Sequence, residues 1–201
     1  MPLTIATLAE VPRWDLARTL ALPGWCRGDA LGPWGENLTR RFGTGAHDRL
    51  RRRLPAEHAR IAPVLTARDT VPAHAQLVLT EAIVDEFLAG DLRALLPLLI
   101  EDTRAGIGRI QLALLKTIGA HRAIAQGARS FRSVYDRGGA EADTAKGRAR
   151  VTFRGHELFA HPTWRALQLM ATATVLDLAG TPGTVSGEDL GDEAFATIAT
   201  W

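Results

Sequence analysis

Six histidines in this chain could bind a metal or exchange protons, because imidazole titrates near neutral pH. His156 and His161 lie on either side of Glu157, where a strand is expected to end. These three residues could converge on a weak metal or acid-base site. The alternative is that each histidine caps a helix or lies at the surface. The other four histidines are His47, His58, His74 and His121. None of the six forms a His-x-x-x-His or Glu-x-x-His motif.

A second candidate site is the stretch SFRSVYDRGG, where a helix is expected to end at a Gly-Gly pair. Phe131 and Tyr135 are four positions apart and therefore share one face of a helix, where they could meet Trp164 and Met170. Two interpretations remain open. The aromatic side chains either fill the core, or they line a pocket in which the Tyr135 hydroxyl or Arg132 orients a ligand.

Residues 36 to 60 carry seven arginines against three acidic residues, and such basic patches can bind the phosphates of nucleic acids. Few aromatic residues accompany these charges, and residues 141 to 201 contain eight acidic residues against five basic ones. A solvated basic face is therefore favoured over a nucleic-acid site. The arginines are Arg40, Arg41, Arg49, Arg51, Arg52, Arg53 and Arg60.

The acidic stretch GEDLGDE offers carboxylates of the kind that hard cations prefer. Its order does not match a calcium-binding loop, so a solvated turn is the favoured interpretation. The four acidic residues are Glu188, Asp189, Asp192 and Glu193.

The remaining motifs argue against an enzyme. RAGIGRI lacks the preceding strand of a dinucleotide-binding loop, and GTPGTVSG lacks the Gly-Lys-Ser/Thr of a phosphate-binding loop. No Gly-x-Ser-x-Gly elbow occurs, and no Ser/His/Asp triad can be proposed from spacing. Cys26 is the only cysteine, which excludes an intrachain disulfide and a Cys-rich zinc site. We expect no catalytic constellation, no metal and no cofactor.

The elements that must position these residues change in character along the chain. Apolar residues recur every three or four positions in the first two thirds, which predicts helices, whereas residues 148–154 alternate with period two, which predicts a half-buried strand. Helices are expected over residues 33–43, 46–54, 72–89, 92–118, 120–137 and 162–179, and strands over residues 25–31, 140–144, 148–154, 183–190 and 194–201.

Two of these helices have features that bear on the fold. The helix over 92–118 should break or kink near Pro97 or at the Gly106/Gly108 pair, and Ile107, Ile110, Leu114 and Ile118 form one apolar stripe on it. The helix over 162–179 has an uncharged interior, residues 166–176, and should lie between two layers. The order of elements predicts an α+β fold, in which an N-terminal helical layer precedes a C-terminal antiparallel sheet with strand-strand-helix-strand-strand order.

Composition places the chain in a broad class. Its 201 residues, 46% of them hydrophobic, fit one domain with a sizeable core, and the formal net charge is only +2. The start lacks the basic region and apolar run of a secretory signal, and the uncharged stretch ALQLMATATVL is too short to span a bilayer. A single cysteine is typical of a reducing compartment. These features predict a cytoplasmic protein without a membrane partner.

Several segments in order resemble a family of proteins of similar length that is best known from myxobacteria: RGDALGPWGENLTRRFG, VPAHAQLVLTEAIVDEFL, YDRGG, GRARVTFRG and GEDLGDEAFATIATW. That family is similar to the four-vinyl-reductase-type ligand domains and to the haem-nitric-oxide-binding (H-NOX) domains. The resemblance covers residues 27–201 and implies a single sensor-like α+β domain, preceded by an extension over residues 1–26 that could pack on it. It also implies a cavity between the helical layer and the sheet, which in relatives accepts phenols, acyl chains, tetrapyrroles or haem.

The resemblance implies no haem in this chain. H-NOX domains hold the haem propionates with a Tyr-x-Ser-x-Arg motif, and the matching positions here carry Phe131, Ser133 and Tyr135. The ligating histidine of those domains lies upstream of the motif, yet no histidine occurs between His74 and His121. Residues 181–201 also lack the cysteines that four-vinyl-reductase-type domains often carry near their last strands.

We therefore predict a non-enzymatic ligand-binding or sensory domain for a small hydrophobic molecule. The alternative is a protein-protein interaction or dimerisation module that uses residues 72–89 or 107–118 and has no small-molecule ligand. The candidate ligand-binding residues are Phe131, Arg132, Tyr135, Trp164 and Met170.

Overall fold

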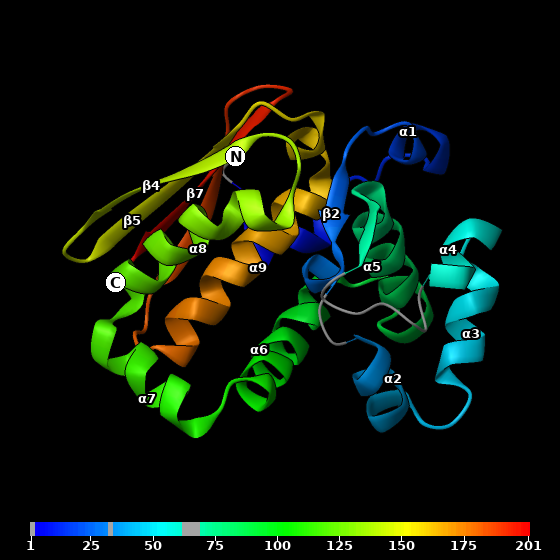
Figure 1. Cartoon of the computed structure of the whole chain (residues 1–201), viewed down its shortest axis with the longest axis horizontal. Coiled ribbons are helices and arrows are strands. Elements are labelled where there is room, and N and C mark those ends of the chain that lie inside the picture. Colours follow the sequence, from blue (N-terminus) through cyan, green and yellow to red (C-terminus); the bar gives the residue numbers. More distant parts are fainter. Residues whose placement is uncertain (1–2, 32–33, 62–68) are drawn as a thin grey trace.

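The structure is a computed structural model that describes residues 3–31, 34–61 and 69–201. An antiparallel sheet lies at one side of the molecule, helices α8 (Ala120–Val134) and α9 (Pro162–Leu178) cross one of its faces, and shorter helices lie farther away beyond α5 (His74–Phe87) and α6 (Leu95–Gly106) (Figure 1). This arrangement confirms the predicted α+β class.

The larger sheet is antiparallel throughout, with the strand order β1-β6-β7-β5-β4. The predicted order of strand, strand, helix, strand, strand is confirmed, because two hairpins flank α9 in the sequence and meet in space through the pairing of β5 with β7. The edge next to β6 is covered by β1, where Leu3 pairs with Gly187. The strands are β1 (Leu3–Thr4), β4 (Gly139–Ala145), β5 (Arg148–Arg154), β6 (Thr184–Asp189) and β7 (Ala194–Thr200).

Alternation along β5 decides which face of the sheet is covered. Ala149, Val151 and Phe153 are buried, whereas Arg148 and Arg154 are exposed. This is the pattern of an antiparallel sheet with one packed face and one solvated face. Both α8 and α9 contact β5 or its neighbours, so they supply the packed layer.

Helix α9 lies between the sheet and the helical layer, as its uncharged interior predicts. It begins at Pro162, whose fixed backbone angle suits a first turn, after His161 caps the helix by accepting a hydrogen bond from the Thr163 backbone N–H at 3.2 Å. Its buried side chains include Trp164 and Met170. It contacts β6 and β7 on one side and α5 and α6 on the other.

The helical layer is built around α5, which buries nine of its fourteen residues. The expected interruption of residues 92–118 falls at Gly106–Gly108, whereas Pro97 lies in the first turn of α6, where its missing N–H costs nothing. Pro33, the expected start of the first helix of this layer, lies outside the described residues. The other helices of the layer are α2 (Trp34–Phe42), α3 (Ala46–Arg53) and α4 (Ala56–Ile61). Helix α7 (Arg109–Ile118) lies apart from them and packs against α8 and α9 (Figure 1).

The N-terminal residues run alongside both layers. After β1 come a 3₁₀ helix over Ala6–Glu10, which buries Leu8, the short helix α1 (Leu16–Leu20) and strand β2 (Trp25–Arg27). Strand β2 pairs with β3 (Thr70–Pro72) in a separate two-stranded sheet. The predicted boundary at residue 26 falls within β2, and the division of the chain into an extension and a domain stays a prediction.

Three predicted elements differ in extent, two of them because of a contact with a distant segment. The strand predicted over 25–31 stops at Arg27 and continues as a 3₁₀ helix. The helix predicted from 72 begins at His74, because Pro72 belongs to β3. The helix predicted to 137 ends at Val134, because Tyr135 forms an isolated bridge with Cys26.

The apolar stripe predicted on residues 107–118 is not covered as a buried stripe would be. Ile110 is 86% exposed and Leu114 is 57% exposed, and no residue of α7 is fully buried. Periodicity places these side chains on one face but does not supply a neighbour for that face.

None of the helices in the described part of the chain is long and apolar enough to cross a membrane.

Candidate functional site

A cavity of about 380 Å³ lies where α9 meets the helical layer, and we name it the helical cavity. Its volume falls in the range of small-molecule sites. The walls come from α5, α6, α7 and α9, and they are mostly apolar. The apolar side chains are Ala30, Leu99, Ile107, Leu115, Leu167, Ala171, Val175 and Leu178, and the polar ones are Gln76, Thr80, Thr103, Gln168 and Thr174.

Thr174 is the most informative polar residue of this cavity. Its side chain is 5% exposed, and its Oγ1 has no hydrogen-bond partner among the described residues. A buried hydroxyl without a partner costs about 1–3 kcal/mol, and folded proteins rarely leave one in place without a reason. The hydroxyl therefore offers an unused donor and acceptor at the cavity wall.

Gln76 presents a fixed amide to the same cavity. Its Nε2 donates to the Ala30 carbonyl oxygen at 2.6 Å, and its Oε1 accepts from the Tyr135 hydroxyl at 2.7 Å. Each bond uses only part of what an amide can donate or accept, so the group can still bond to a ligand while it is held in position. Tyr135 therefore lies one hydrogen bond away from the cavity and orients one of its walls.

The other predicted site residues are distributed between core and surface. Phe131 stacks on Tyr135 with ring centroids 4.7 Å apart, and it lines a smaller cavity of about 170 Å³ between α8, β5 and α9. Trp164 and Met170 are fully buried, and Trp164 packs edge-on against Phe153. Phe131 does not meet Trp164 directly in a ring contact, because Phe153 and Phe159 lie between them.

Arg132 lies apart from these residues. Its side chain is exposed and lines a polar surface hollow beside β4 and β5. The structure thus brings Phe131 and Tyr135 near the α9 cavities, places Trp164 and Met170 in the core, and leaves Arg132 outside. Their role as ligand-binding residues stays a prediction.

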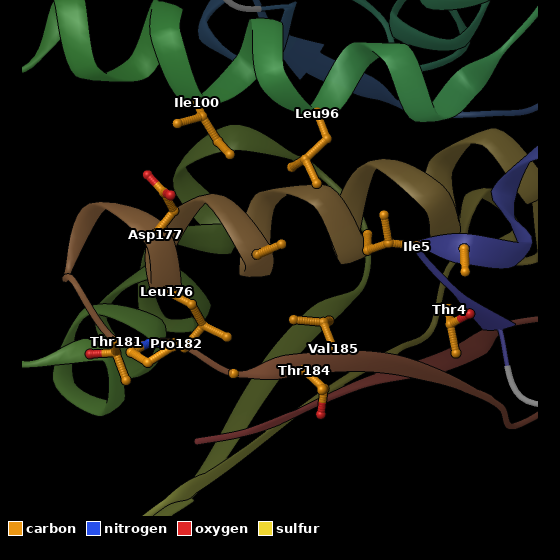
Figure 2. A pocket seen from close by; sticks show the side chains of 13 residues that line it. Thr4, Ile5, Leu96, Ile100, Leu176, Asp177, Thr181, Pro182, Thr184 and Val185 are labelled. Atoms are coloured by element: carbon orange, nitrogen blue, oxygen red, sulfur yellow. The ribbon is translucent and has the colours of Figure 1, made fainter.

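A second, mostly apolar hollow lies next to α9. It has a volume of about 510 Å³. Leu96 and Ile100 point into it from α6 and Val185 points into it from β6 (Figure 2). Asp177 at its rim is held by Arg104 at 2.6 Å. Among the described residues, none that lines this hollow has an unpartnered buried polar atom, so it offers shape without a group to orient a ligand.

His156 and His161 do not form the metal or acid-base site that their spacing allowed. The Nδ1 of His161 caps α9 and its Nε2 lies 3.1 Å from Thr19 Oγ1, so the ring has no free lone pair for proton abstraction. The Nδ1 of His156 accepts from the Leu158 backbone N–H at 3.1 Å. Each histidine caps a helix, as the alternative interpretation of the sequence proposed. In the described ranges, the one cluster with metal-ligand spacing lies elsewhere.

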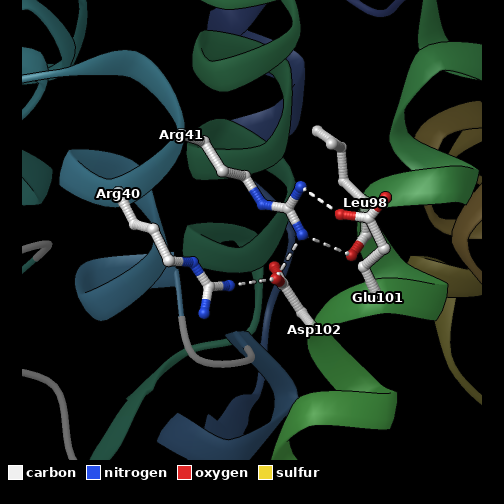
Figure 3. Close-up of polar contacts among 5 residues, drawn as sticks. All are labelled: Arg40, Arg41, Leu98, Glu101 and Asp102. Atoms are coloured by element: carbon white, nitrogen blue, oxygen red, sulfur yellow. Dashed lines mark hydrogen bonds and ion pairs between the residues drawn. The ribbon is translucent and has the colours of Figure 1, made fainter.

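The basic patch is largely neutralised by contacts within the fold. Arg41 binds Glu101 at 2.8 Å and Asp102 at 2.5 Å, and Arg40 binds Asp102 at 3.1 Å, so that α2 is fastened to α6 (Figure 3). Glu86 of α5 accepts from Arg53 at 2.8 Å and lies 3.4 Å from Arg49. Several of these arginines therefore serve to connect helices through ion pairs. This agrees with the interpretation of a solvated basic face rather than a phosphate-binding site.

The acidic turn is likewise held by arginines. Asp189 accepts hydrogen bonds from the Gly191 backbone N–H and from Arg165, each at 3.0 Å. The bond from Gly191, helped by the one from Arg165, holds the pKa of its carboxyl below the usual value. Glu188 pairs with Arg150 at 2.6 Å.

The residues define an α+β domain with a mostly apolar cavity against a central helix. No protein-family model matches the chain, and no curated protein matches it. Two solved structures of the H-NOX family do resemble it. One, from work on the function of haem distortion, has a TM-score of 0.53 and 10% identity over 87% of this chain and 94% of that chain. The other, the Fe(II) unliganded H-NOX protein from K. algicida, has a TM-score of 0.52 and 13% identity over 87% of this chain and 95% of that chain.

The chain therefore has an H-NOX-like α+β fold, and at such low identity the likeness extends to the fold alone. The similarity to the myxobacterial family and to four-vinyl-reductase-type domains stays a prediction. The helical cavity does not fit a haem. Haem iron is held by His, Cys, Met or Tyr, and none of these lines the cavity in the part of the chain that the structure describes.

Sequence reasoning did not single out Thr174 or Gln76. The signal for Thr174 was present but shared, because Gln168 and Thr172 are also polar residues within the uncharged interior of α9. Gln76 and Thr80 are polar residues four positions apart in a helix that is otherwise mostly buried, and such a pair can also indicate a polar cavity wall.

Proposed function

We propose that this chain binds a small, mainly apolar molecule in the helical cavity and serves as a non-enzymatic sensory domain. The observation that carries the proposal is the buried, unpartnered Thr174 hydroxyl in a cavity of about 380 Å³. The ligand would be apolar over most of its surface and would carry one hydroxyl, carbonyl or N–H group that bonds to Thr174. The H-NOX-like fold supports this proposal, because both neighbours belong to a family named for haem and nitric oxide binding.

The cavity walls support binding rather than catalysis. Gln76, Thr80, Thr103, Gln168 and Thr174 are amides and hydroxyls, and no carboxylate or imidazole is among the described lining residues. Amides and hydroxyls orient a ligand by hydrogen bonds, but they do not gain or lose a proton near pH 7. The expectation of a cytoplasmic location, which rests on the start of the chain, the short uncharged stretch and the single cysteine, stays a prediction.

The substitution Thr174→Val tests this proposal, because valine has nearly the same shape but no hydroxyl. We expect the free energy of unfolding to rise by about 1 kcal/mol, since the unpartnered hydroxyl is removed, while ligand affinity falls about tenfold. Native mass spectrometry of the purified chain would identify a retained ligand. Calorimetric titration with phenol, indole and octanol would measure affinity.

Thr172→Val is the matched control on the same helix. Thr172 donates to the Gln168 carbonyl oxygen at 2.9 Å and does not line the helical cavity. We expect this variant to bind as the unmodified chain does and to lose up to about 1 kcal/mol of stability. Equal loss of binding in both variants, or no binding of any of the three probes, would contradict the proposal.

Self-association through α7 is a second candidate function, favoured by one observation. Ile110 and Leu114 are four positions apart and both face solvent, and exposed apolar patches often mark interfaces. The alternative helix, residues 72–89, is unsuitable because α5 is mostly buried. The partner would be a second copy of this chain.

Light scattering after size-exclusion chromatography tests the α7 interface. The double substitution Ile110→Ser and Leu114→Ser should convert a dimer to a monomer, whereas Lys116→Ser on the same helix should leave the dimer intact. A chain that is monomeric at all concentrations rules this function out, and a dimer that survives the double substitution assigns the interface to another surface.

A further inference from the structure

A cluster of two histidines and one glutamate lies in the helical layer, away from the helical cavity. Glu57 and His58 belong to α4, and His74 is the first residue of α5. One ligand atom from each residue can be chosen so that all three atoms lie within 4.8 Å of one another. The two imidazole rings have their centroids 5.2 Å apart. His74 follows Glu57 and His58 by 17 and 16 positions in the sequence. Only the packing of α4 on α5 therefore brings it close to them.

His58 is buried without a hydrogen-bond partner among the described residues, which is unusual for a histidine. Its side chain is 4% exposed, and neither Nδ1 nor Nε2 has a hydrogen-bond partner among the described residues. By contrast, both ring nitrogens of the buried His161 are bonded.

His74 has the arrangement typical of a metal ligand. Its Nδ1 lies 3.3 Å from the backbone carbonyl oxygen of Leu22, and the ring can only donate at that position because a carbonyl does not donate. The proton is therefore on Nδ1, and Nε2 carries the lone pair. Metal-binding histidines commonly donate their second N–H to a backbone carbonyl in this way, which fixes the ring.

The distance between His58 and Glu57 also suits a shared ion. Nδ1 of His58 lies 3.4 Å from Oε1 of Glu57. Two ligand atoms bonded to a tetrahedral zinc ion at about 2.0–2.1 Å are separated by about 3.3 Å. The side chain of Glu57 is 65% exposed and that of His74 is partly exposed, so both can turn by the amount needed to close the remaining separation.

We propose that Glu57, His58 and His74 bind one divalent transition-metal ion, with zinc as the expected metal and water as the fourth ligand. Two imidazoles and one carboxylate form a ligand set that zinc accepts. Oxygen-preferring ions such as calcium and magnesium are disfavoured by the two nitrogen ligands. The ion fastens α4 to α5, and through His74 it is linked to the segment that carries Leu22. This site is independent of the proposed ligand in the helical cavity.

Zinc binding by the full chain, freed of metal by dialysis against a chelator, tests the proposal. Equilibrium dialysis followed by metal analysis should give one zinc ion per chain. His74→Ala should weaken zinc binding at least about 100-fold, because even residues behind the ligands contribute about 10–100-fold. Glu57→Gln should weaken it at least about tenfold. Zinc at 100 times its dissociation constant should raise the melting temperature of the unmodified chain by roughly 5 to 10 °C.

His121→Ala is the matched control, because His121 is exposed and lies on α8. It should bind zinc as the unmodified chain does. His58→Ala should also abolish binding, and because His58 is buried, circular dichroism must show that this variant is folded. If it is not, His74→Ala and Glu57→Gln decide, since both residues are at least partly exposed. The proposal is overturned if the chain takes up no zinc, if His121→Ala loses as much affinity as His74→Ala, or if Glu57→Gln binds unchanged.

Discussion

Replacing Asp102 by alanine is expected to lower the free energy of unfolding by about 3–5 kcal/mol. Asp102 is 6% exposed and accepts hydrogen bonds from Arg40 and Arg41 (Figure 3). The side chain of Arg41 is only 13% exposed, and its Nε has no partner among the described residues. Without Asp102, a mostly buried guanidinium would lose its nearest counter-charge, and this is the costly way to break a buried ion pair. Urea unfolding followed by circular dichroism measures the change.

Glu101→Ala provides the control, because Glu101 is adjacent in sequence and binds the same arginine. Its side chain is 64% exposed, and it accepts from Arg41 at 2.8 Å. Exposed ion pairs contribute about 0–1 kcal/mol, so we expect a loss of less than about 1 kcal/mol. Similar losses of unfolding free energy in the two variants would contradict the prediction. They would show that the buried Asp102 stabilises the contact of α2 with α6 no more than the exposed Glu101 does.

Stability is expected to fall by about 3 kcal/mol through His161 alone as the pH is lowered from 6.5 to 4. Burial lowers the pKa of His161 from 6.5 to about 4, with a smaller contribution from the positive charge of Arg18. Between these values the unfolded chain binds a proton on this residue and the folded chain does not, so acid favours unfolding. The contribution is fully present above pH 6.5 and is lost as the pH falls through about 4.

Other buried groups titrate in the same region, so the effect must be measured as a difference. Burial lowers the pKa of His156, which acts in the same direction, whereas burial raises the pKa of Glu81, which acts in the opposite direction. His161→Asn isolates the contribution, because asparagine is a good helix cap and does not titrate. Urea unfolding at pH 7, 6, 5 and 4 should show a flatter pH dependence for this variant. Parallel curves for the two proteins would refute the assignment.

Those elements of the fold that depend on local sequence patterns could be predicted from the sequence. Alternation in Ala149, Val151 and Phe153 identified β5 and its buried face, and the uncharged run in α9 identified a helix between two layers. The ends of elements were less predictable, because distant residues set them. Helix α8 ends before Tyr135 because Tyr135 pairs with Cys26. No sequence pattern near either residue predicts that pairing.

The candidate sites show the same division. Phe131 and Tyr135 do stack on each other, but Tyr135 lies just beyond the end of α8 rather than on its face. The cavity also depends on Gln76, which reaches Tyr135 from α5. His58 and His74 were known as separate histidines, and only the packing of α4 against α5 makes them neighbours. On α7, periodicity gave the apolar face, but whether another element covers a face is a property of the whole fold.

The pairing of β1 with β6 has a consequence for the order of folding. Leu3 and Thr4 pair with Gly187 and Ser186, so nearly the whole chain separates the two partners. During synthesis β1 emerges long before β6 and cannot pair with it until that strand has also left the ribosome. Contacts of such long sequence separation form slowly, because the entropy of closing the loop is lost before any contact is gained. The local hairpins and helices can form earlier, and the edge of the sheet beside β6 is the last part to be protected from pairing with other chains.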